Sequence, residues 1–244
     1  MPVDINGNIK KNIMTLREIV YQLRLDIRKQ ELFDDDELSN RMIKKWVHDQ
    51  RALWIRNEIN KNHTIDDQII QPVCMELEVA DRSECPSKIT GVSVLKSKLE
   101  LPKTIELHYT DGIIKVGSVD KLAYDYSYVH LERAKFAGNG LFNSKIITVF
   151  RYNNYIYLVS KRVKNFARYV RFIMVYGLFE DPTTLAAFTH VTGEACYSDD
   201  DDYPLNSWMW NYMRTEILKL NLPLIVEGVT DKVNDANENV TKDA

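Results

Sequence analysis

Residues 37–60 read ELSNRMIKKWVHDQRALWIRNEIN and predict the longest helix of the chain. Apolar and amide side chains recur there at helical spacing and mark one face: Ile43, Trp46, Val47, Gln50, Leu53, Trp54 and Asn57. We expect this face to be buried and the basic side chains to lie mostly on the other side: Lys44, Lys45, Arg51 and Arg56. Two interpretations stay open, because each tryptophan can bury roughly 150–250 Å². The face is ordinary core, or Trp54 or the basic side meets another subunit.

A second helix is predicted upstream, over residues 15–30. Its start has the form of a capping box, in which Thr15 and Glu18 each accept a hydrogen bond from the other's backbone N–H. An apolar stripe follows at helical spacing: Leu16, Ile19, Val20, Leu23 and Ile27. The acidic stretch 34–36 then lies at the positive N-terminal end of the long helix, where negative charge is stabilising. Residues 15–60 are therefore predicted to form a helical hairpin.

A third helix is predicted near the C-terminus. Tyr203-Pro204-Leu205 opens it, because proline suits the first turn of a helix, and it runs to about Leu220. Its buried side is expected to consist of Leu205, Trp208, Met209, Tyr212, Met213 and Ile217. Four consecutive aspartates, 199–202, precede it. They lack the spaced ligands and glycine turn of a calcium loop, which favours a solvated loop.

The middle of the chain has the composition of a β region. Strands are predicted at Val73–Val79, Gly91–Leu95, Ile105–Tyr109, Ile113–Val116 and Tyr169–Phe179. The Asp111-Gly112 pair indicates a hairpin between two of them. Residues 123–131 fit either a short helix or an irregular segment, and 183–189 fit a short helix.

The strongest hairpin signal is Asn153-Asn154, between 146–152 and 155–160. Asparagine tolerates the positive φ that a type I′ turn needs at both positions. A two-residue turn fixes the register and pairs Tyr152 with Tyr155, Phe150 with Tyr157, Thr148 with Val159, Arg151 with Ile156, and Val149 with Leu158. One face is aromatic and the other mostly aliphatic. Either the chain covers both faces itself, or another subunit covers one.

These patterns predict an α+β fold. Residues 1–62 form the first part of a helical domain, 63–180 a separate, mainly antiparallel β lobe, and 181–230 a helical part that packs back on 1–62. Residues 231–244 are polar and are expected to form an exposed tail.

Charge is unevenly distributed, although the formal net charge is only −3. Residues 133–179 carry nine Lys or Arg and no Asp or Glu, whereas 180–244 carry thirteen acids and four bases. Such blocks indicate charged partners. We expect a subunit or channel contact at Arg151, Lys161, Arg162, Lys164, Arg168 and Arg171.

Catalytic and metal motifs are absent from the sequence. It has no GxSxG, HExxH, Walker or GxGxxG pattern, and its five histidines stand singly. Three cysteines, Cys74, Cys85 and Cys196, form no CxxC and are expected to be free thiols, with a Cys74–Cys85 pair as the less favoured alternative. We expect no enzyme activity, no cofactor and no metal.

Several stretches, in this order, resemble a structural protein of crAss-like podoviruses. They are MTLREIV at 14–20, DDDELS at 34–39, Ile43-x-x-Trp46-Val47-x-x-x-Arg51-Ala52-Leu53, GLFEDP at 177–182, Tyr203-Pro204-Leu205, and the tail with Asp231, Asn234 and Asp235. The family resembles the head-to-tail connector, or ring and adaptor, proteins that dock on the portal. The long β region departs from a minimal helical adaptor.

The resemblance implies a ring of twelve copies in the virion, assembled in the bacterial host cytoplasm. Its partners would be the portal, the next tail or ring protein, and packaged double-stranded DNA passing without sequence recognition, with no membrane. A ring has heterologous contacts, which complementary charge blocks would serve. Portal or neighbour contacts are expected at Lys44, Lys45, Arg51, Asp231, Asn234 and Asp235.

An alternative function is sheet-based binding of single-stranded nucleic acid. Residues 145–172 interleave Lys and Arg with aromatic side chains, as proteins that stack nucleobases do. The aromatic residues are Phe150, Tyr152, Tyr155, Tyr157, Phe166, Tyr169 and Phe172. Salt-dependent oligonucleotide binding by a monomer would favour this function, and ring formation without nucleic acid would favour the connector.

Overall fold

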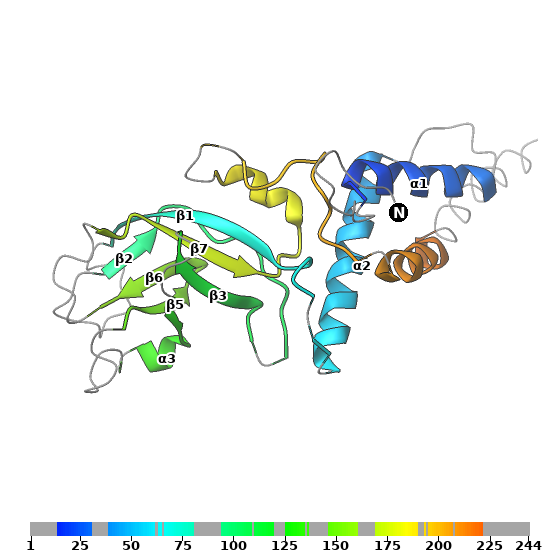
Figure 1. The fold of residues 1–244 in the computed structure, drawn as a ribbon. Helices are drawn as coiled ribbons and strands as arrows, with labels where there is room; N and C mark the ends of the chain where they lie inside the picture. Colours follow the sequence, from blue (N-terminus) through cyan, green and yellow to red (C-terminus); the bar gives the residue numbers. More distant parts are fainter. Residues whose placement is uncertain are drawn as a thin grey trace, which may run out of the picture. The chain divides into compact units, whose positions relative to one another are not determined.

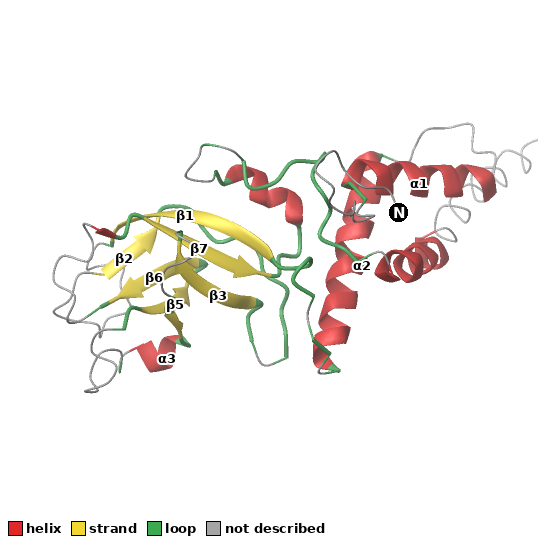
Figure 2. Ribbon diagram, viewed as in Figure 1, coloured by secondary structure: helices red, strands yellow, loops and turns green. Residues whose placement is uncertain are grey.

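The computed structural model separates helices from strands along the chain (Figures 1 and 2). It describes residues 14–30, 39–61, 63–64, 66–80, 94–108, 110–119, 125–134, 136, 146–160, 169–189, 193, 195–206 and 208–221. Two compact units result, a helical unit of Met1–Asn57 with Asp199–Ala244 and a β unit of Glu58–Ser198. The predicted α+β class, with helices from both ends of the chain and a mainly antiparallel sheet from its middle, is confirmed.

The helical unit begins with α1 (Leu16–Gln30). The capping box is confirmed, since Glu18 Oε2 accepts from the Thr15 N–H at 3.0 Å and Thr15 Oγ1 accepts from the Glu18 N–H at 3.2 Å. All five residues of the predicted apolar stripe are buried. The segment before the last helix lies against this start, because the Tyr203 N–H donates to the Met14 carbonyl at 3.0 Å.

The last helix spans residues 208–221 and is joined to α1 by polar contacts. Arg214 donates from Nε and Nη2 to the two carboxylate oxygens of Asp26, at 2.5 and 2.6 Å. Trp210 donates from Nε1 to Gln22 Oε1 at 3.2 Å. The predicted start was too early, because 203–205 are buried but not helical.

Helix α2 (Asn40–Asn60) buries a different face from the one predicted. The side chains that it buries are Ile43, Val47, His48, Arg51 and Ile55. The expectation that Arg51 lies on the solvated side is therefore wrong. Its guanidinium is 0% exposed, and Nε donates to the Pro204 carbonyl at 2.7 Å. His48 Nδ1 shares a hydrogen bond with the Tyr203 hydroxyl at 2.8 Å, so a distant segment selects this face of the helix.

Over its described residues, the β unit forms a seven-stranded sheet in the order β3-β7-β1-β2-β6-β5-β4. The strands are β1 (Gln71–Val79), β2 (Val94–Ser97), β3 (Ile113–Ser118), β4 (Ser127–Tyr128), β5 (Thr148–Tyr152), β6 (Tyr155–Val159) and β7 (Phe172–Gly177). The pairs are antiparallel except for β4 with β5.

The two edges of this sheet meet. Gly117 of β3 forms a bridge with Asp125, and the Tyr126 N–H donates to the Val116 carbonyl at 2.8 Å, directly before β4 begins. The sheet therefore curls round until its two ends touch, which gives it the form of a small barrel. Side chains fill the interior, among them Val73, Met75, Val116, Val149, Leu158, Ile173 and Val175.

The Asn153-Asn154 hairpin is confirmed in detail. The two asparagines have φ of 46° and 64°, and all five predicted cross-strand pairs of β5 and β6 form. The aliphatic face lies in the barrel interior. The aromatic face carries Phe150 stacked on Tyr157, with ring centroids 5.4 Å apart, and packs with Val94 and with Ala134 of α3 (Leu131–Ala134). The chain thus covers both faces itself.

The predicted strand Ile105–Tyr109 and its hairpin are wrong over the described residues. Residues 105–107 are not in a strand, and β3 pairs with β7 instead. The Ile105 N–H donates to the Leu178 carbonyl, and the Leu178 N–H donates to Gly112. Gly112 has the left-handed backbone conformation that glycine favours, with φ of 73°, although it joins no hairpin there.

Three remaining segments are resolved as follows. Residues 125–134 combine β4 with the short helix α3, and the helix expected at 183–189 is a 3-10 helix, Pro182–Ala187, capped by Asp181. Strand β2 begins at Val94, and residues 91–93 of that predicted strand lie outside the described residues.

Candidate interaction surfaces

No catalytic constellation stands out in the part of the chain that the structure describes. Among those residues, no three His, Cys, Asp or Glu side chains are placed to hold a metal ion. Among the described residues, Cys74 and Cys196 take part in no disulfide bond, and burial raises the pKa of Cys196. Within the same residues, no helix combines the length and apolarity needed to cross a membrane.

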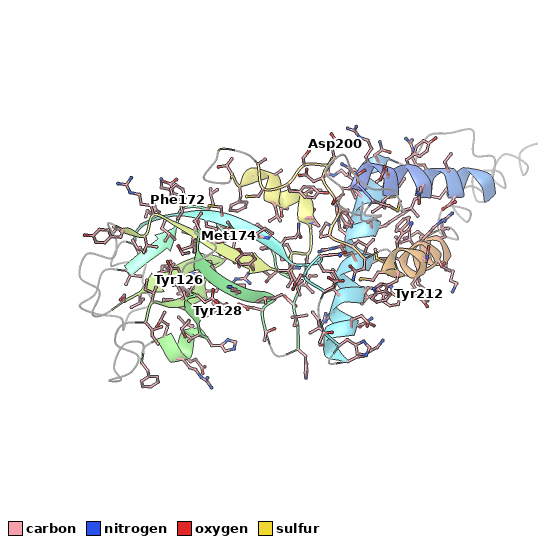
Figure 3. All side chains as sticks on the ribbon, in the orientation of Figure 1. Tyr126, Tyr128, Phe172, Met174, Asp200 and Tyr212 are labelled. Atoms are coloured by element: carbon pink, nitrogen blue, oxygen red, sulfur yellow. The ribbon has the colours of Figure 1, made fainter. Side chains whose placement is uncertain are left out.

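The aspartate run pairs with basic side chains of the helical unit. Asp199 pairs with Lys44 of α2, and Asp200 lies 3.1 Å from Arg17 of α1 (Figure 3). A notch of about 230 Å³ lies between the two helices, and Arg17, Lys44, Asp199 and Tyr21 line it. The run is solvated as expected, since Asp200, Asp201 and Asp202 are exposed, and two of its carboxylates also pair with bases of α1 and α2.

Arg151 forms hydrogen bonds inside the β unit. Its Nη1 donates to Thr104 Oγ1 at 2.9 Å, and Nη2 donates to Asn154 Oδ1 at 2.8 Å. The charge pattern indicated only carboxylate or nucleic-acid partners for this guanidinium, whereas it binds two neutral oxygens, one of them 47 residues away in sequence. A contact of Arg151 with another molecule remains a prediction.

The other expected contact residues fall into three groups. Arg171 and Lys45 are exposed, so a partner can reach them. Arg51 is buried and cannot offer its side chain to a partner. The rest lie outside the described residues: Lys161, Arg162, Lys164, Arg168, Asp231, Asn234 and Asp235.

A groove lies at the end of the barrel that carries the Asn153-Asn154 turn. Its volume is about 1020 Å³, and segments 99–107 and 184–188 contribute to its lining, together with Asp111 and Arg151. The Tyr128 hydroxyl donates to the Asp111 carboxylate, and burial together with this bond raises the pKa of Tyr128. Among the described residues that line the groove, there is no serine or cysteine that an adjacent base could activate.

The stacking platform of the alternative function is only partly accessible in the described residues. Phe150 and Tyr157 are buried, and Lys96 Nζ lies 4.1 Å from the ring centroid of Tyr155. Nucleobases cannot stack on the buried rings of Phe150 and Tyr157, and Lys96 occupies one face of Tyr155, which is half-buried as Tyr152 is. Tyr169 is exposed and Phe172 half-buried, and Phe166 lies outside the described residues.

The helical unit carries a partly exposed aromatic cluster, although its residues were predicted to be buried. Trp208 and Tyr212 were expected to be core, yet 47% and 59% of their surfaces are exposed. Both contact Trp54 of α2, with ring centroids 6.3 and 5.5 Å apart respectively. Figure 3 shows Tyr212 on the last helix, close to α2. The apolar spacing identified these residues, but not their exposure.

Comparison with known proteins gives one family. The family model described as phage tail ring protein 2 matches residues 18–243, which include both units of the fold. No curated protein matches the chain. The match extends beyond the helical ends on which the resemblance rested and includes the β barrel. The chain therefore belongs to the phage tail ring protein 2 family of crAss-like phages and is a structural component of the virion.

Proposed function

We propose that copies of this chain close into a ring between the portal and the tail and continue the DNA channel through it. The observation that carries the proposal is the match to a tail ring family over residues 18–243. The resemblance to portal adaptors implies twelve copies, with the portal on one side and the next tail protein on the other. A channel of this kind conducts DNA without reading its sequence, and it requires no catalysis.

The charge pattern supports a role at a boundary between molecules. Arg171 is exposed next to a segment, 161–168, that carries four more basic residues. Exposed charge pairs contribute only about 0–1 kcal/mol each. A ring repeats each pair once per copy, so small contributions add up to a preference for closure. Salt should weaken assembly in the same direction.

Charge reversal tests this part of the proposal. The double variant Arg168→Glu and Arg171→Glu should reduce assembly on the purified portal, as counted in negative-stain images, while its circular dichroism stays unchanged. Lys219→Glu, at an exposed position of the last helix, is the matched control. Normal assembly with loss of packaged DNA would assign the basic block to the channel. No change in either measurement would show that the block is only solvated surface.

A direct test of ring formation uses the full-length chain without nucleic acid. Mass photometry should show one large species, and electron microscopy should show closed rings. A protein that stays monomeric alone and with portal, but binds oligonucleotides in a salt-dependent way, would contradict the proposal and favour the alternative.

A further inference from the structure

Helix α2 carries more apolar surface than its own unit covers. Its core side includes Ile43 and Val47, which are fully buried, whereas Met42 and Leu53 remain 44% and 48% exposed. Eleven residues separate Met42 from Leu53, so they lie on nearly the same side of the helix and about 16 Å apart. One side of α2 packs in the core of the unit, whereas Met42 and Leu53 stay open to solvent on a side that also carries the exposed charges of Lys45, Asp49 and Arg56.

The C-terminal half of this open side is extended by the last helix. Trp54 packs edge-on against Trp208, with an interplanar angle of 81°, and is tilted 32° from the Tyr212 ring. Leu53 lies next to Trp54 in sequence. These four residues, the aromatic surface, are held by two helices and carry no charge. Aromatic side chains on rigid elements lose little conformational freedom on binding, and Trp and Tyr are enriched among residues that dominate binding energy.

We propose that the aromatic surface of Leu53, Trp54, Trp208 and Tyr212 is one half of the contact between neighbouring copies of this chain, an inference that rests on the proposed ring. A ring contact is heterologous, so each copy must present two different surfaces to its neighbours. The helical unit also carries a second exposed apolar pair on another helix, Tyr21 and Leu25, one turn apart on α1. The unit therefore has the two distinct apolar surfaces that a heterologous contact requires.

The first test perturbs the aromatic surface where the side chains are most exposed. Tyr212→Asp and Leu53→Asp each add a charge without emptying the core, so both monomers should fold with native circular dichroism. Ile114→Asp is the matched control, because Ile114 is 43% exposed at an irregularity of β3 in the β unit. The protein concentration at which rings form should rise about tenfold or more for the two surface variants and should change little for the control.

The outcomes separate this inference from the proposed function. If the wild-type chain forms rings and both surface variants do so at the same concentration, the inference is wrong and the ring proposal stands. If the wild-type chain forms no ring alone, with portal or in virions, both are wrong. If the control variant loses assembly as strongly as the surface variants, the effect is not specific to the aromatic surface and the inference is also wrong.

A second measurement identifies what lies on the surface. Tyr212 is replaced by the photoreactive p-benzoylphenylalanine, and rings are assembled from a mixture of light and isotopically heavy copies before irradiation. Cross-linked peptides of mixed isotopic composition, joining position 212 to another copy, support the inference. Cross-links only within one copy, to its own termini or β unit, or only to the portal, overturn it.

Discussion

Gly112→Ala gives a sharp test of the β unit, because the chain supplies its own control. Gly112 has φ of 73°, and Gly193, in the same unit, has φ of 87°. A Cβ at Gly112 would lie 2.6 Å from the Ile105 carbonyl oxygen and 3.2 Å from Thr104 Cβ, whereas a Cβ at Gly193 would meet nothing within 4 Å. The two substitutions therefore share the conformational cost and differ in the steric one.

The magnitudes follow from these contacts. Placing alanine at positive φ costs about 1–2 kcal/mol, and the lost freedom of the unfolded chain offsets about 0.4–1 kcal/mol of that. Gly193→Ala should therefore lower the free energy of unfolding by about 1 kcal/mol or less. The backbone contact at Gly112 adds about 1–3 kcal/mol of overpacking, so Gly112→Ala should cost about 1–4 kcal/mol.

The assay separates the two units by their chromophores. All four tryptophans belong to the helical unit, whereas the strands lie in the β unit. Urea unfolding followed by far-ultraviolet circular dichroism should show the β transition at lower urea for Gly112→Ala, with a smaller shift for Gly193→Ala. Tryptophan emission should report a nearly unchanged helical transition. Equal shifts for the two variants would refute the steric account of the turn at Gly112.

Three further predictions concern single interactions. Because the pKa of Tyr128 is raised, its contribution to stability is present below the ordinary tyrosine pKa of about 10 and is lost as pH rises above it, so Tyr128→Phe should flatten the alkaline fall in urea midpoint. Arg214→Met leaves the largely buried Asp26 carboxylate without two donors and should lower the tryptophan-detected unfolding free energy by about 1.5–3 kcal/mol, while adding Asp26→Leu should recover part of it. Asn153→Val should cost about 1–2 kcal/mol in chemical unfolding, because a β-branched residue resists positive φ, whereas Asn153→Gly should be neutral or stabilising.

Local patterns of the sequence predicted the elements whose partners are close along the chain. The Asn153-Asn154 turn fixes the whole register of β5 and β6, because a two-residue turn leaves one pairing. The capping box of α1 joins residues three apart, and the apolar stripe of that helix is buried as expected. The charge blocks, by contrast, predicted partners whose identity remains a proposal.

Elements that depend on distant partners could not be placed from the sequence. Arg51 is buried because the Pro204 carbonyl, 153 residues away in sequence, accepts its hydrogen bond. Residues 105–107 have the composition of a strand and were predicted to pair with β3, but β3 pairs with β7. Trp208 and Tyr212 have the spacing of core residues, and only the packing of the last helix on α2 shows that they stay exposed. The helical spacing of apolar residues identifies an apolar face, but it does not show whether other residues cover that face.

The most direct test of the proposed ring is electron cryomicroscopy of the portal–tail region of virions that carry this chain. The helical unit and the β barrel should each fit, as separate rigid bodies, into repeated density that closes around the DNA channel between portal and tail. Twelve repeats would agree with the resemblance to portal adaptors. Density for this chain that lies away from the tail axis, or that does not close around the channel, would contradict the account.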